Sequence, residues 1–119
     1  MKNRIIYSIL AILFLSALPA WAQESSPTDE IVVKATNAVI FQMTANLKLT
    51  QDQISAVRPI ITDNIVKVRN LQQSLEDGSI DGNTMYTRRE QLTNDEYQKL
   101  SAILTPDQMK LWVNIQNNT

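Results

Sequence analysis

A short acidic segment over 77–82 has residue types and spacing that suggest binding of a metal ion. Asp77, Ser79 and Asp81 stand at the first, third and fifth positions of a calcium-binding loop, and a glycine follows at the sixth. The twelfth position of such a loop requires a bidentate glutamate, and here it is Arg88. The segment is better explained as a turn between helices, with Gly78 in the left-handed position that follows a helix end. We therefore predict no metal site.

Paired carboxylates are the second group of residues in this chain that could take part in chemistry, here as a general acid and a general base. Asp95 and Glu96 can act as general acid and base only if burial raises the pKa of one of them, and we expect both to be solvated. The chain has no histidine and no cysteine, so the catalytic dyads that need either residue are impossible. No nucleophile with a neighbouring base and no phosphate-binding loop accompanies the carboxylates. We predict a protein without enzyme activity, catalytic residues or cofactor.

The first 22 residues have the pattern of a secretory signal peptide. Lys2 and Arg4 precede an apolar run over 5–18, and small residues follow at Ala20 and Ala22. The run is shorter than the roughly 20 residues needed to span a bilayer as a helix. We expect cleavage after Ala22, a periplasmic location and no stable membrane anchor.

Removal of residues 1–22 leaves 97 residues with 9 basic and 12 acidic side chains, a net charge of −3. That charge argues against nucleic acid as a partner. The polar stretch 23–28 is predicted to be a disordered leader, and 29–119 has the length of a single domain.

Apolar residues recur at helical spacing along the mature chain, and no segment shows the two-residue alternation typical of a strand. The pattern predicts an all-α fold of four helices in a hairpin-type arrangement. The helices are expected over 29–47, from Thr50 to about position 76, from a cap at Asp81 or Asn83, and from Pro106 onward. The long second helix contains Pro59, and its apolar stripe continues in phase on both sides, which predicts a kink without a break.

A five-residue pattern, Leu-Thr-x-x-Gln, occurs twice in the chain. Its defining residues are Leu49, Thr50, Gln53, Leu104, Thr105 and Gln108. A threonine followed three residues later by glutamine is a capping box, in which each side chain bonds the backbone N–H of the other residue. We therefore predict that each copy caps the start of a helix.

With these two motifs, an exported start and a Gly-x-x-Asp turn, the chain resembles the LTxxQ-motif family of periplasmic proteins from Gram-negative bacteria, the Spy and CpxP group. The resemblance implies a hairpin that pairs with a second copy as a thin, curved, antiparallel homodimer. It implies an ATP-independent chaperone that binds unfolded or misfolded envelope proteins under envelope stress. The alternatives within the family are a regulatory adaptor for a folded envelope sensor and a metal-responsive protein, and the lack of histidine disfavours the latter.

The resemblance also implies that clients are held through basic and apolar contacts on a concave face. The basic candidates in this chain are Arg58, Lys67, Arg69, Arg88 and Arg89. A small domain with a broad apolar stripe on its first helix covers that surface poorly as a monomer, which favours a dimer independently of any family.

Overall fold

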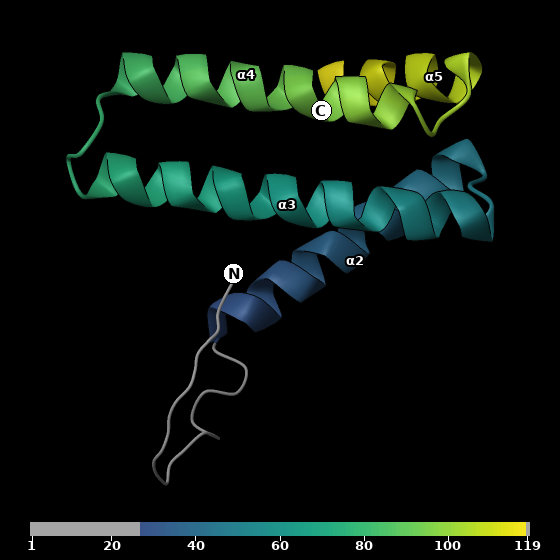
Figure 1. The fold of residues 1–119 in the computed structure, drawn as a ribbon, viewed down its shortest axis with the longest axis horizontal. Coiled ribbons are helices and arrows are strands. Elements are labelled where there is room, and N and C mark those ends of the chain that lie inside the picture. The colour runs from purple at the N-terminus through teal and green to yellow at the C-terminus, as the bar shows by residue number, and fades with distance from the viewer. Residues whose placement is uncertain (1–26, 119) are drawn as a thin grey trace, which may run out of the picture. The chain divides into compact units, whose positions relative to one another are not determined.

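The computed structural model describes residues 27–118, so the expected signal peptide, its cleavage site after Ala22 and residues 23–26 lie outside the described range. The described residues form four helices and no strand (Figure 1). The helices are α2 (Pro27–Leu47), α3 (Gln51–Glu76), α4 (Gly82–Ser101) and α5 (Pro106–Asn117). The prediction of an all-α fold with four helices is confirmed. None of these helices is long and apolar enough to cross a membrane.

Helix α2 begins two residues earlier than predicted. Pro27 and Thr28, which the sequence placed in a disordered leader, belong to the helix. Proline is well suited to the first position of a helix, because its N–H would have no helical partner there and its φ is already helical. Pro27 is therefore the first helical residue of the described range.

Helix α3 starts at the first Leu-Thr-x-x-Gln motif. The hydroxyl of Thr50 accepts from the N–H of Gln53 at 3.1 Å, and the Gln53 side chain accepts from the N–H of Thr50 at 3.0 Å. The predicted capping box is thus present. The helix runs through Pro59 without interruption. Whether it bends there stays a prediction.

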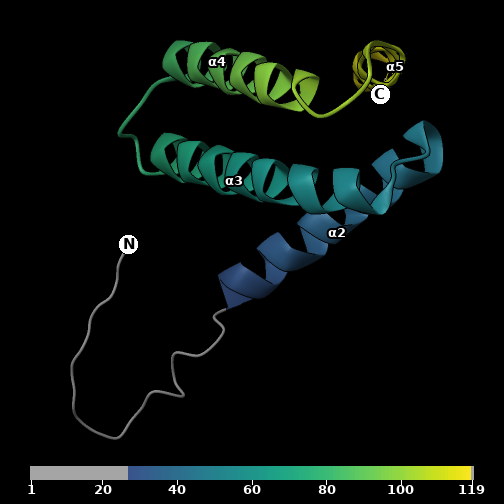
Figure 2. The same ribbon diagram turned by 45° about the vertical axis from the view of Figure 1, so that its right-hand side comes forward.

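The turn after α3 reverses the chain, so that α4 lies side by side with α3 as an antiparallel hairpin (Figures 1 and 2). Gly78 takes the predicted left-handed conformation, with φ of 80°. Of the two predicted caps for α4, Asp81 is the one used: its carboxylate accepts from the N–H of Thr84 at 2.8 Å. That hydrogen bond favours the ionised carboxylate and lowers the pKa of Asp81.

The core lies at the end of the hairpin remote from this turn. It combines the C-terminal half of α2, the first half of α3, the end of α4, and α5. Met43, Val57 and Leu100 are its most completely buried side chains. Toward the 77–81 turn, Met85 is the one buried apolar side chain of the hairpin. The hairpin is therefore well packed at one end and thinly covered at the other.

Candidate functional site

The two Leu-Thr-x-x-Gln motifs, 55 residues apart in sequence, meet in space. The Gln53 amide donates to the Gln108 carbonyl oxygen at 2.7 Å, and the Gln108 amide donates to the Gln53 carbonyl oxygen at 3.2 Å. We call this reciprocal pair, Gln53 and Gln108, the glutamine clasp. The capping boxes are confirmed at both motifs. The pairing of the two motifs was not predicted from the sequence.

Each glutamine of the clasp also reaches the backbone just before the other motif. Gln53 Nε2 donates to the carbonyl of Ile103 at 3.3 Å, and Gln108 Nε2 donates to the carbonyl of Leu47 at 3.0 Å. Each Oε1 additionally accepts from the N–H of its own N-cap threonine. A glutamine side chain has two donor hydrogens and two acceptor lone pairs. Both side chains of the clasp are therefore fully used within the protein and have no hydrogen bond left for a partner.

The remaining motif residues support the same junction. Leu49 and Leu104, the first residue of each motif, are buried in the core with 8% and 5% of their surface exposed. Thr105 repeats the geometry of the first cap, since its hydroxyl accepts from the N–H of Gln108 at 3.1 Å. The doubled motif is a structural junction between the α2–α3 and α4–α5 segments, so a binding surface has to be sought elsewhere.

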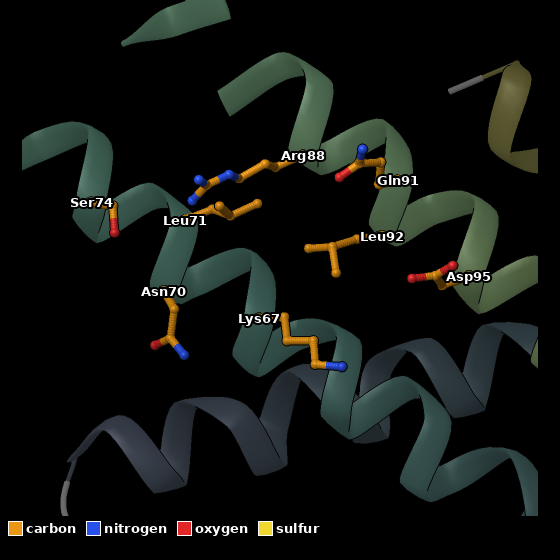
Figure 3. Close-up of a pocket in the computed structure, with 8 residues that line it drawn as sticks. All are labelled: Lys67, Asn70, Leu71, Ser74, Arg88, Gln91, Leu92 and Asp95. Atoms are coloured by element: carbon orange, nitrogen blue, oxygen red, sulfur yellow. The ribbon is translucent and has the colours of Figure 1, made fainter. Parts of the chain in front are cut away.

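A groove between α3 and α4 combines charged and apolar side chains. It has a volume of about 360 Å³. The α3 side contributes Lys67, Asn70, Leu71 and Ser74, and the α4 side contributes Arg88, Gln91, Leu92 and Asp95 (Figure 3). The two leucines lie between the helices, while charged and amide groups form the rim. Such a lining offers apolar contact together with hydrogen-bond donors and acceptors.

The groove continues toward the core as a narrow crevice. The crevice shares Lys67, Leu92 and Asp95 with the wider part. Its other lining residues are Ile60, Asp63, Asn64, Glu96 and Lys99. Acidic and basic side chains therefore lie along the interface between α3 and α4.

The five basic residues proposed as client contacts do not form one cluster. Lys67 and Arg88 line the groove from opposite helices. Lys67 is ion-paired with Asp63 at 2.9 Å, one helical turn away. Arg58 is exposed and donates to the Asn37 side chain of α2 at 2.8 Å.

Arg69 and Arg89 do not contribute to the groove lining. Arg69 is half-buried on α3, and Arg89 is exposed on α4. Spacing along a helix could assign a face to each basic residue, but it could not show which faces of different helices become neighbours.

Glu96 departs from the sequence expectation of a solvated carboxylate pair. Asp95 is exposed as expected, whereas Glu96 is half-buried in the crevice. Burial raises the pKa of the Glu96 carboxyl from 4.5 to about 7. Burial and the nearby Glu96 charge also raise the pKa of the Tyr97 hydroxyl.

The position of Glu96 was visible in the sequence. It stands four residues after Leu92 and four before Leu100, which places it on the apolar stripe of α4. An acidic residue at such a position on an apolar stripe is a signal of burial that the sequence already contains.

Large apolar side chains are exposed on several helices. On α2, Phe41 is 76% exposed and Val33 is 57% exposed, and their separation of eight residues places them on the same face. Tyr86 on α4 and Leu111 on α5 are also exposed, by 70% and 42%. Phe41 is the most exposed of these side chains, although the opposite side of its helix carries the fully buried Met43.

Comparison with protein-family models, curated proteins and solved structures gives no match. The resemblance to the LTxxQ-motif family therefore stays a prediction, carried by the residues of the two motifs. Within residues 27–118, no group of three or more acidic, histidine or cysteine side chains is placed to hold a metal ion.

Proposed function

We propose that this protein is a periplasmic, ATP-independent, chaperone-like protein that binds unfolded or misfolded envelope proteins. The observation that carries the proposal is the exposed apolar face of α2, with Phe41 and Val33 left open to solvent. An exposed phenylalanine has no stabilising role in a monomer that leaves it 76% accessible. Apolar contact with an exposed segment of another protein would remove that surface from water.

The distribution of apolar and charged groups supports reversible capture of varied clients. The apolar side chains are dispersed over α2, α4 and α5 and are not gathered into one deep pocket. Lys67 and Arg88 add positive charge along the groove, which aids the encounter with acidic segments more than it adds affinity. Dispersed, weak contacts favour binding that releases a client once it folds.

The same exposed face supports the proposal of a homodimer. A second copy that covers Val33 and part of α2 would reduce the apolar surface of the monomer. Solution mass, measured by light scattering, tests this directly. A stable monomer at all concentrations would contradict the dimer.

Suppression of aggregation tests the proposed function. The protein is mixed at stoichiometric ratios with several denatured clients, and light scattering is followed after dilution from denaturant. The wild-type protein is expected to reduce scattering, and Phe41→Ser is expected to protect less because the apolar contact is lost. Gln42→Ser, at the neighbouring exposed position, is the matched control and should protect like the wild type. Absence of protection by the wild type across all clients would refute the proposal.

The defined polar lining of the groove favours one alternative, a regulatory adaptor that binds a folded envelope sensor. Affinity capture from an envelope extract separates the two functions. A broad set of unfolded proteins supports the chaperone. One stoichiometric folded partner, lost in Arg88→Gln and kept in Phe41→Ser, supports the adaptor.

A further inference from the structure

Glu96 occupies an unusual place for a carboxyl group. It lies on the face of α4 that packs toward α3, on the same stripe as Leu92 and the fully buried Leu100. Ile60 and Asn64 of α3 line the same crevice. A charged group in such a place loses hydration unless a partner compensates for it.

No such partner is present among the described residues. The charged groups that face the crevice are Asp63 and Lys67 from α3 and Asp95 and Lys99 from α4. Lys67 is already engaged by Asp63 at 2.9 Å. Burial of the carboxyl is the cause of the raised pKa of Glu96. No described side chain forms a hydrogen bond or an ion pair with that carboxyl.

The charge balance of the crevice depends on the protonation of Glu96. With Glu96 ionised, three carboxylates face two ammonium groups. With Glu96 protonated, two carboxylates face two ammonium groups, and the neutral carboxyl loses far less on burial. Tight packing of α3 on α4 is therefore compatible with the protonated form and opposed by the ionised one.

We propose that Glu96 is a proton-operated switch in the α3–α4 hairpin, which packs closely when Glu96 is protonated and loosens along the crevice when Glu96 ionises. Loosening lets water reach the carboxylate and uncovers Ile60 and Leu92, which line the crevice. The switch does not depend on the proposed chaperone function, because hairpin packing is measured without any client.

The direction of the pH dependence follows from linkage. Burial raises the pKa of Glu96 from 4.5 to about 7, so the folded state binds more protons than the unfolded state between these values. The contribution of Glu96 to stability is complete below pH 4.5 and is lost as the pH rises to about 7. The chain has no histidine, so no imidazole titrates in the upper part of this window.

The test is thermal unfolding as a function of pH on the full mature protein, with two variants. Between about pH 5.5 and 8, the wild-type Tm should fall by about 5 °C. Glu96→Gln imitates the protonated carboxyl, so its Tm should change little over the same range. Glu90→Gln, an exposed position on the same helix, should follow the wild type. A wild-type pH dependence retained in Glu96→Gln would overturn the proposal.

A second measurement on the wild-type protein keeps the proposal testable if the variant does not fold. The carboxyl carbon of Glu96 is titrated by nuclear magnetic resonance, and amide exchange of α4 is recorded at each pH. We expect a midpoint near neutral pH together with a loss of protection in α4 that exceeds that in α5. A midpoint near the ordinary glutamate value, or unchanged protection across the titration, would refute the switch.

Discussion

The two ends of the α3–α4 hairpin differ in how closely they are packed. The clasp end contains the core and the paired glutamines, and the groove end lies toward the 77–81 turn. At the clasp end, Met43, Val57 and Leu100 are almost fully buried, and the paired glutamines use every donor and acceptor they have. At the groove end, Leu71 is half-buried, and the rim carries charged groups of both signs. Binding and switching regions are generally drawn from the less stable parts of a fold. The contrast implies that the repeated motif supplies stability, while the groove end is the less stable part of the hairpin.

Truncation of one leucine at each end is expected to change the free energy of unfolding most, and it tests whether the two ends are packed differently. Leu100→Ala removes a side chain with no exposed surface and should lower the free energy of unfolding by about 2–5 kcal/mol. Leu71→Ala removes a half-buried one and should lower it by about 1 kcal/mol. Urea unfolding followed by circular dichroism measures both. Equal losses would show that the two ends are packed alike.

Breaking the clasp has the next largest effect. Gln108→Ala leaves the Gln53 amide and the carbonyl of Leu47 without their partner, which should destabilise the protein by about 1–3 kcal/mol. Gln53→Ala should act similarly. Because the two side chains bond each other, the double variant should lose less than the sum of the single losses. Additive losses in this double-mutant cycle would mean that the glutamines act only as separate caps.

The smallest expected change in the free energy of unfolding comes from relief of backbone strain at Lys48, at the clasp end. Lys48, between α2 and α3, has a left-handed φ of 59°, and its N–H donates to the carbonyl of Thr44 at 3.0 Å. Glycine is the residue usually found in that conformation after a helix. Lys48→Gly should raise the free energy of unfolding by about 0.5–1 kcal/mol. A loss of stability would show that the lysine side chain compensates for its backbone.

Features that depend on local chemistry were predictable from the sequence. The start of α3 follows from Thr50 and Gln53, the start of α5 from Thr105 and Pro106, and the left-handed turn from Gly78. Each requires only residues within one helical turn of each other.

Features that join distant segments were not predictable in the same way. Nothing in the spacing of Gln53 and Gln108 indicates that their amides would meet, because this depends on how the α3–α4 hairpin brings its two helices together. Lys67 and Arg88 share a groove for the same reason. Glu96 is intermediate: its spacing from Leu92 and Leu100 places it on the inner face, but its lack of a partner depends on what α3 presents to it.

The clasp also has a consequence for the alignment of the hairpin. Gln53 lies near the start of α3, and Gln108 lies beyond the end of α4, so the two can meet only if α3 and α4 pair in one particular longitudinal register. A slip of one helical turn would move the amides apart by about 5.4 Å and break their hydrogen bonds to each other. The hydrogen bonds between Gln53 and Gln108 therefore fix how far α3 and α4 are shifted along each other. They select the one alignment in which the chain between the two motifs, including the turn at 77–81, has the right span.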